Sequence, residues 1–266
     1  MGEATRDVGS CIVTRKENYA IVAFNRPDKL NAFDHKMFES MRDAFYEVAD
    51  DKSIRAVVFT GTGDHFSAGG DVEEDINPLK SKSARDFKHY FEDLGELYMR
   101  LYNHQVPTIA AINGYALGAG MELALCCDIR IAANTAQMGE FFVKMGLVPE
   151  AGMCLLPKIV GMGMAKLLCY TGNLVSGEEA CRIGLVEKVV ALPELMPEAE
   201  KLAARLARGP YSISLMKRAI NEFSQLSLEA SMNTAIAYQF QASRTADHPE
   251  AVMSFIEKRK PNFKGE

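Results

Sequence analysis

Apolar and polar positions follow two different periods along the first half of the chain. Residues 11–25, CIVTRKENYAIVAFN, contain two β-branched runs around a polar turn at Lys16–Asn18, which predicts a hairpin. Asp34 then precedes apolar residues at helical spacing, and this predicts a capped helix with the buried face Met37, Phe38, Met41, Phe45 and Val48. The next apolar run, IRAVVFTG (54–61), predicts a buried strand.

The alternation of helices and strands continues toward the middle of the chain. A long helix is predicted over residues 84–103, and its apolar side is formed by Phe87, Phe91, Leu94, Tyr98 and Leu101. Two strands, PTIAAING (107–114) and DIRIAA (128–133), enclose a helical segment, MELALCC. Apolar strands that alternate with helices predict an α/β core.

From about Glu194 the pattern becomes entirely helical. Four helical segments follow without a strand between them: PEAEKLAARLA, PYSISLMKRAINEFSQ, LEASMNTAIAYQFQASR and HPEAVMSFIEKRK. We therefore predict a core over residues 1–193 and a C-terminal helical region over residues 194–266, which serves in assembly or covers the site.

Composition excludes several classes of function. With 266 residues, 48% of them hydrophobic and 24% charged, the chain has an ordinary globular composition. The net charge of −5 argues against nucleic-acid binding, because the chain has no strongly basic field to neutralise phosphates. The six cysteines lack CxxC spacing and the five histidines are scattered, which predicts buried reduced thiols and no metal site. The stretch MGEATRDVGS lacks the apolar segment of a secretory signal, and no apolar run reaches membrane-spanning length, so we expect no membrane association and a cytoplasmic location.

Two glycine-rich loops carry the first candidate chemistry. In FSAGGD (66–71) the amide of Ala68, and in LGAGMEL (117–123) the amide of Ala119 at a helix start, can point at one oxygen atom. Two converging N–H groups form an oxyanion hole. Ordinary tight turns are the alternative interpretation, and the phosphate-binding motif GxxxxGK[ST] is absent.

Six ordered motifs resemble the crotonase (enoyl-CoA hydratase/isomerase) superfamily over nearly the whole chain: NRPDKLNAF, GTGDHFSAGGDV, PTIAAINGYALGAGMELALCCDIRIA, GLVPEAG, EEACRIGLVEKVV and EKRKPNF. The resemblance implies a spiral of ββα units with a C-terminal helical trimerisation region, assembled as a homo-trimer or a dimer of trimers. It implies an acyl-CoA substrate whose thioester oxygen is held by Ala68 and Ala119. No separate cofactor is implied, because coenzyme A enters as part of the substrate.

The same resemblance implies a coenzyme A site. Lys29 lies at the entrance, the Ser67–Asp71 loop surrounds the adenine, and the C-terminal segment reaches the nucleotide, sometimes that of a neighbouring subunit. The implied residues are Lys29, Ser67, Ala68, Gly70, Asp71, Lys260 and Phe263. For the two lysines, a solvated surface charge is the alternative.

The candidate acids depart from the hydratase pattern. Hydratases of this family use two glutamates, and Glu122 in GAGME matches the first, but Phe142 occupies the place of the second. A phenylalanine cannot hold water or move a proton. Glu150 in GLVPEAG instead resembles the single carboxylate of one group of Δ3,Δ2-enoyl-CoA isomerases, which takes a proton from C2 and returns it to C4. Such a base needs an apolar pocket to raise its pKa, and we expect Phe142, Met145 and Met153 to contribute to the acyl pocket.

Other interpretations of the acids stay open at this stage. Glu122 and Glu150 together could hold a water molecule, either for hydration or for thioester hydrolysis. Hydration could also use Glu122 alone. Glu122 could instead be a carboxylate that only interacts with the dipole at a helix N-terminus. Glu150 could be a solvated loop acid. From a different class, the chain could be a non-catalytic module that binds coenzyme A.

Overall fold

Seven strands form one large sheet whose central part is parallel. The computed structural model describes residues 4–266, so the first three residues of the N-terminal stretch lie outside the description. In spatial order the strands are β1 (Ala4–Val8), β2 (Cys11–Arg15), β3 (Ala20–Phe24), β4 (Val57–Gly61), β5 (Thr108–Ile112), β7 (Ile129–Ala133) and β10 (Lys188–Val190). β2 and β3 pair antiparallel, as the predicted hairpin requires, β1 pairs antiparallel with β2, and the remaining neighbours are parallel.

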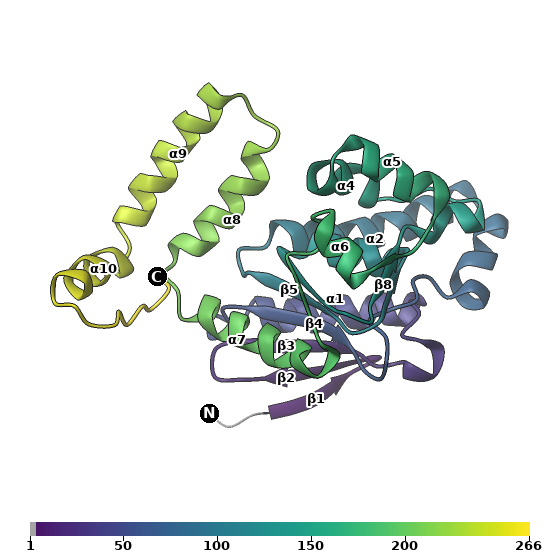
Figure 1. Cartoon of the computed structure of the whole chain (residues 1–266), viewed down its shortest axis with the longest axis horizontal. Helices are drawn as coiled ribbons and strands as arrows, with labels where there is room; N and C mark the ends of the chain where they lie inside the picture. Colours follow the sequence, from purple (N-terminus) through teal and green to yellow (C-terminus); the bar gives the residue numbers. More distant parts are fainter. Residues whose placement is uncertain (1–3) are drawn as a thin grey trace.

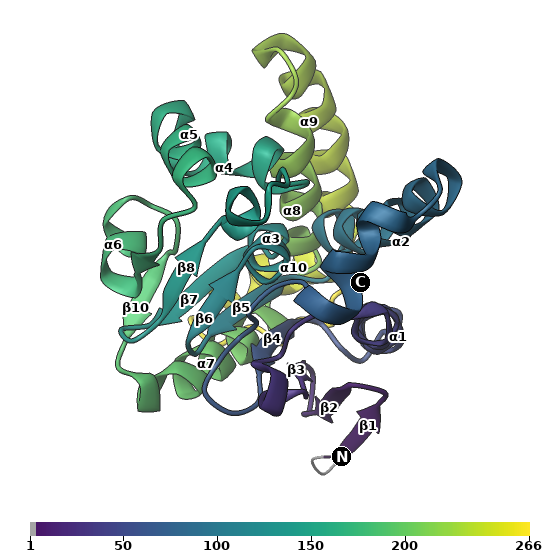
Figure 2. The same ribbon diagram turned by 90° about the vertical axis from the view of Figure 1, so that its right-hand side faces the viewer.

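The central strands β3, β4, β5 and β7 are largely buried on both faces of the sheet, which explains why they are almost continuously apolar. The edge strand β1 is polar and mostly exposed. Phe59 of β4 and Ala110 of β5 lie in a core that also contains side chains of α1 (His35–Ala49) and α2 (Ala84–Asn103). The alternate residues face a second core built by α7 (Leu195–Ala207). α7 is therefore a core helix, although the sequence pattern grouped it with the helical region after residue 193 (Figures 1 and 2).

The two long helices of the first core follow their predicted patterns with one exception. The carboxylate of Asp34 accepts a hydrogen bond from the Met37 N–H at 2.8 Å and caps α1, as predicted. α2 begins and ends where the sequence pattern predicts. Its apolar side is fully buried from Leu94 onward. The exception is at its N-terminal end, where Phe87 is 40% exposed.

A second, three-stranded sheet positions the candidate site. It consists of β6 (Tyr115–Leu117), β8 (Gln137–Gly139) and β9 (Val175–Ser176). Strands of two or three residues leave no periodic signal, so the sequence pattern did not predict them. The associated helices are α3 (Ala119–Cys126), α4 (Gly152–Val160), α5 (Met162–Thr171) and α6 (Gly177–Arg182), and the short helical turns are η1 (Pro27–Lys29), η2 (Val72–Ile76), η3 (Asn77–Ser81), η4 (Phe141–Met145) and η5 (Leu192–Glu194).

The last three helices extend to one side of the two sheets (Figure 1). They are α8 (Ser212–Phe223), α9 (Leu228–Ser243) and α10 (Asp247–Ile256), so all four predicted C-terminal helices form. Within residues 4–266, no helix is both long and apolar enough to cross a membrane. The cysteines are free thiols, and Cys11, Cys126 and Cys127 are buried as predicted. The prediction is wrong for Cys154, which is exposed on α4, and Cys169 and Cys181 are only half-buried.

Candidate active site

The two glycine-rich loops lie against each other. Ser67 forms a bridge with β6: its N–H donates to the Tyr115 carbonyl at 2.8 Å, and its carbonyl accepts from the Leu117 N–H at 3.0 Å. Gly69, with a φ of +89°, comes so close that a Cβ there would lie 2.6 Å from the Leu117 carbonyl oxygen and 3.5 Å from the Ala119 nitrogen. Only glycine allows this approach.

The two predicted oxyanion donors differ in their hydrogen bonding. Ala119 is the first residue of α3, so its N–H has no acceptor within the helix. The Ala68 N–H donates to the Leu30 carbonyl oxygen at 3.0 Å. A thioester oxygen would therefore have to share the Ala68 N–H with Leu30 or displace it.

Glu122 projects from α3, a helix in which every residue is buried. Its Oε1 accepts hydrogen bonds from two backbone N–H groups, those of Glu150 at 2.7 Å and Gly152 at 2.8 Å, whereas its buried Oε2 has no partner. Burial raises the pKa of Glu122 above its ordinary value. Hydrogen bonds from the Glu150 carboxyl and from these N–H groups lower the pKa, but they do not cancel the effect of burial.

Glu150 is half-buried between η4 and α4, so it is not a fully solvated loop acid. Its pKa is raised to about 9, first by burial, then by the charge of Glu122 and by a hydrogen bond between the two carboxyl groups. Its buried Oε2 has no hydrogen-bond partner. Glu122 and Glu150 therefore form a pair that shares protons, because two adjoining carboxylates cannot both ionise easily.

A third acid, Glu140, was missed by the sequence analysis. It follows β8 directly and is fully buried, with no hydrogen-bond partner at either carboxyl oxygen. Burial, and after it the charges of Glu122 and Glu150, raise the pKa of Glu140 well above its ordinary value. The available signal was an isolated acid between Met138–Gly139 and a pair of phenylalanines, Phe141 and Phe142, since buried carboxyls are rare without a function or partner.

Phe142 lies beside the loop that carries Ala119, the predicted oxyanion donor. Its side chain is buried, and its ring comes within 3.7 Å of the Cβ position at Gly118, the residue before Ala119. Met145 and Met153, which we predicted to contribute to the acyl pocket, are exposed in the single chain. Phe142 is thus the member of the predicted pocket that the fold brings to the loops.

The family of the chain follows from its similarity to known proteins. A family model described as enoyl-CoA hydratase/isomerase matches residues 14–266. The chain belongs to the enoyl-CoA hydratase/isomerase family. Members of this family act on acyl-CoA substrates, so the chain is an acyl-CoA enzyme of the crotonase fold.

Named relatives in the family have different activities. The chain is 40% identical to a crotonyl-CoA hydratase of Syntrophomonas wolfei, over 95% of this chain and 96% of the relative. It is 36% identical to a 1,2-epoxyphenylacetyl-CoA isomerase of Escherichia coli, over 92% of this chain and 94% of the relative. Solved structures support the fold: an enoyl-CoA hydratase of Bacillus anthracis superimposes with a TM-score of 0.89 at 30% identity over all of both chains. DspI of Pseudomonas aeruginosa gives 0.89 at 34% identity over 97% of this chain and 98% of that one.

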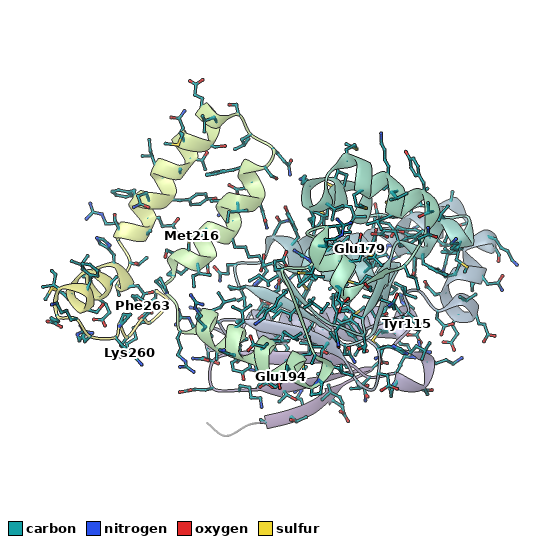
Figure 3. All side chains as sticks on the ribbon, in the orientation of Figure 1. Tyr115, Glu179, Glu194, Met216, Lys260 and Phe263 are labelled. Atoms are coloured by element: carbon teal, nitrogen blue, oxygen red, sulfur yellow. The ribbon has the colours of Figure 1, made fainter. Side chains whose placement is uncertain are left out.

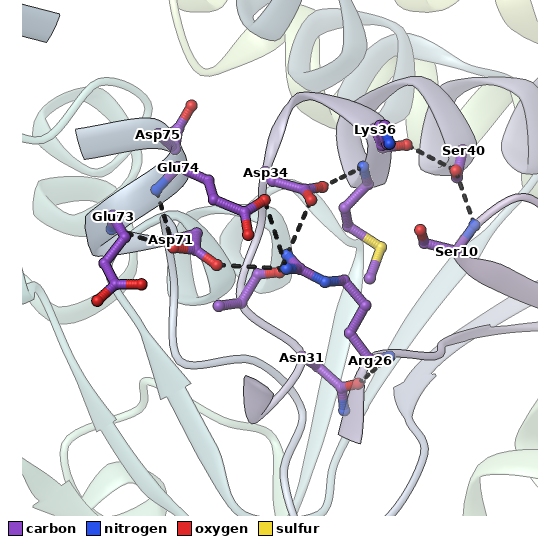
Figure 4. Close-up of polar contacts among 12 residues, drawn as sticks. Ser10, Arg26, Asn31, Asp34, Lys36, Ser40, Asp71, Glu73, Glu74 and Asp75 are labelled. Carbon is purple, nitrogen blue, oxygen red and sulfur yellow. Dashed lines mark hydrogen bonds and ion pairs between the residues drawn. The ribbon is translucent and has the colours of Figure 1, made fainter. Parts of the chain in front are cut away.

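Among the residues predicted to bind coenzyme A, Asp71 has a clear structural role. It accepts from the N–H groups of Glu73 and Glu74 at 3.1 Å each and lies 3.3 Å from the Arg26 guanidinium, which also pairs with Asp34 (Figure 4). Burial opposes its ionisation, but the N–H groups and the Arg26 charge outweigh burial and keep the pKa of Asp71 below its ordinary value. This network joins the predicted coenzyme A loop to α1.

The remaining predicted coenzyme A residues are distributed over two regions. Lys29 in η1 is exposed, Gly70 is half-buried, and the Ser67 hydroxyl donates to the Asn31 carbonyl at 2.8 Å. Lys260 and Phe263 lie beside α10 at the outer edge of the molecule (Figure 3). A role for Lys260 and Phe263 in binding the nucleotide stays a prediction.

Proposed function

We propose that this enzyme moves the double bond of a 3-enoyl-CoA to the 2-position, with Glu150 as the acid/base. The observation that carries the proposal is the position of Glu150: it is a half-buried acid with a pKa raised to about 9 and one unpartnered oxygen. Phe142 supports the proposal, because a buried phenyl ring replaces the second hydratase glutamate. By excluding water, the ring would protect the dienolate intermediate of the isomerisation from side reactions.

The proposed reaction has three proton transfers, one between the two acids and two to or from the substrate. Glu150 first passes its proton to the adjoining Glu122 carboxylate and becomes the base. It then takes the proton from C2, and the electron pair of that C–H bond moves onto the thioester oxygen to give a dienolate. The Ala119 N–H, together with the Ala68 N–H once it turns from Leu30, stabilises this oxygen. Glu150 finally gives the proton to C4, and the double bond forms between C2 and C3.

Hydration of a 2-enoyl-CoA is the second candidate. The name of the crotonyl-CoA hydratase relative favours it, and so do the unpartnered oxygens of Glu122 and Glu150, which would accept hydrogen bonds from a water molecule. In this mechanism, one carboxylate removes a proton from water as the oxygen attacks C3, and the other carboxyl protonates C2.

The test compares 3-hexenoyl-CoA with crotonyl-CoA, with products followed by enoyl absorbance and by mass. We expect 3-hexenoyl-CoA to become conjugated without a gain in mass. We also expect Glu150→Gln to slow this reaction about 10²- to 10⁴-fold, the usual contribution of a general base. Glu229→Gln, at an exposed position on α9, is the matched control and should leave the rate unchanged.

The other outcomes separate the alternative functions. Addition of one water to crotonyl-CoA that is lost in Glu122→Gln would replace the isomerase proposal with hydration. Release of free coenzyme A would indicate a hydrolase. A protein that binds coenzyme A but leaves every thioester unchanged would be the non-catalytic module. We expect the substrate to supply coenzyme A, with no separate cofactor, and we expect a cytoplasmic location.

A further inference from the structure

The first turn of α3 carries Ala119, whose N–H the proposed reaction uses, and three hydrogen bonds hold this turn in place. The Gly118 N–H donates to the Gly139 carbonyl of β8 at 2.9 Å, and the Gly118 carbonyl accepts from the Glu122 N–H at 2.9 Å. The third contact comes from a side chain, because the hydroxyl of Tyr98 donates to the Ala119 carbonyl oxygen at 3.2 Å. Together these contacts fix the peptide groups on both sides of Ala119.

Tyr98 belongs to α2, so its contact joins two helices that are separate in the sequence. Its side chain is 4% exposed, and Leu94, Leu97 and Leu101 of the same helix are buried in the same core. Because packing already holds the ring, the hydrogen bond to α3 requires little further loss of side-chain freedom. The hydroxyl is therefore a preorganised donor.

The same hydroxyl faces the acids of the site but stays protonated. Burial raises the pKa of Tyr98 well above its ordinary value, and the charge of Glu122 raises it further. The charges of Glu150 and Glu140 act in the same direction. Since a phenol already has an ordinary pKa of about 10, Tyr98 is a neutral donor at neutral pH and not an additional acid or base.

The orientation of the first turn matters for the chemistry. The Ala119 N–H stabilises a negative oxygen only if it points at the place where the charge develops. The residue before it, Gly118, has a φ of +47° and a ψ of −122°, a conformation that suits glycine, and it has no side chain that could hold the turn. A contact from another element to the next peptide group therefore limits the movement of this helix start.

We propose that Tyr98 is a positioning residue, which keeps the Ala119 N–H directed at the thioester oxygen through its hydrogen bond to the Ala119 carbonyl. The proposal rests on the oxyanion part of the proposed function, which isomerisation and hydration share. Tyr98 acts through Ala119 and takes no part in the proton transfers.

The first test uses a saturated thioester, which has no double bond to move or hydrate. Butanoyl-CoA with an isotopic label at the thioester carbonyl is bound to the protein, and infrared difference spectra record its carbonyl stretching frequency. Hydrogen bonds to the oxygen lower this frequency, because they weaken the C=O bond. We expect Tyr98→Phe to lower it less than the original protein does. Tyr46→Phe is the matched control and should leave the frequency unchanged, since the Tyr46 hydroxyl donates to Glu96 at an exposed position.

The second test measures kcat and KM of the same variants with the substrate found active. Tyr98→Phe keeps the ring and removes one hydrogen bond. We expect kcat to fall about 3- to 10-fold with KM nearly unchanged, because the charge on the thioester oxygen is larger in the transition state than in the bound substrate. A loss of stability alone would leave both the carbonyl frequency and kcat of the folded protein unchanged.

Three results would overturn the proposal, and they can be told apart. If the original protein lowers the carbonyl frequency and Tyr98→Phe lowers it equally, the role of Tyr98 is wrong and the oxyanion assignment stands. If the original protein does not lower the frequency, the oxyanion assignment of the proposed function is wrong as well. A rise in KM at unchanged kcat in Tyr98→Phe would mean that Tyr98 acts on substrate binding as a whole.

Discussion

At the scale of single residues, the acidic site depends on Gly152. Its N–H donates to Glu122, and the space where its Cβ would stand is filled by the Glu140 carboxyl. The same residue begins α4, in a turn that has no side-chain cap. Glycine is required here because the Glu140 carboxyl lies too close for a Cβ, and not because of the backbone conformation, since the φ of Gly152 is outside the left-handed region.

We expect Gly152→Ala to lower the free energy of unfolding by about 1–3 kcal/mol, because the new methyl group overpacks a buried site. Activity should fall as well, since the Glu122 and Glu140 carboxyls must move apart. Gly95→Ala on α2 is the matched control: a Cβ there has open space, and alanine favours the helix by up to about 1 kcal/mol. Chemical denaturation of both variants measures the difference. Equal stabilities of the two variants would contradict this account.

At the scale of elements, one buried lysine attaches α8 to the core. The ammonium of Lys217 lies 2.8 Å from Asp128 and donates to the Val106 carbonyl at 3.0 Å and the Leu101 carbonyl at 3.3 Å. These acceptors lie at or near the ends of α2, β5 and β7. Lys217 therefore connects the C-terminal helices to the region where three core elements meet.

Lys217→Ala should destabilise the protein by about 3–5 kcal/mol, because it leaves a partly buried carboxylate and two carbonyl oxygens without their cation. Lys201→Ala removes an exposed ion pair on α7 and should cost less than about 1 kcal/mol. Denaturation curves give both values, and limited proteolysis shows whether α8 to α10 are cleaved first in Lys217→Ala. A small effect of Lys217→Ala, like that of the control, would show that the apolar packing of α8 alone holds it.

At the scale of the whole molecule, α9 is poorly covered in the single chain, although it packs along α8, where the rings of Tyr238 and Phe223 lie 6.4 Å apart. None of its residues is buried, and Ile236 and Phe240, one helical turn apart, are 65% and 61% exposed. The turn between α8 and α9 extends away from the sheets (Figure 2). An exposed apolar helix face of this kind is typical of an interface between protein chains, in agreement with the predicted trimer or dimer of trimers.

We expect light scattering after size-exclusion chromatography to give the mass of a trimer or hexamer. Ile236→Asp combined with Phe240→Asp should shift the protein toward monomer, because each charge would be buried at an apolar interface. Asn173→Asp adds a charge at an exposed site after α5 and should leave the mass unchanged. A monomeric original protein would show that the C-terminal helices serve another purpose.

Sequence patterns predicted the long elements well and the short ones poorly. α1 and α2 have several turns of amphipathic periodicity, and Asp34 is a recognisable cap, so their positions follow from local physics. β6, β8 and β9 are too short to carry a period, although they position both the oxyanion loop and Glu140. Glu122 and Glu150 lie in recognisable motifs, whereas Glu140 follows a strand too short to be predicted, so its burial could not be foreseen.

By itself, the sequence determined the family, the α/β core, the four C-terminal helices and two of the three acids, because periodicity and ordered motifs are local properties. Only the tertiary structure decided that α7 is a core helix, that the Ala68 N–H is bonded to Leu30, and that the carboxyl groups of Glu122 and Glu140 converge at Gly152. These facts depend on distances between segments far apart in the chain. The pKa of Glu150 follows from the same cause, since burial and the neighbouring charge of Glu122 arise only when the chain is folded.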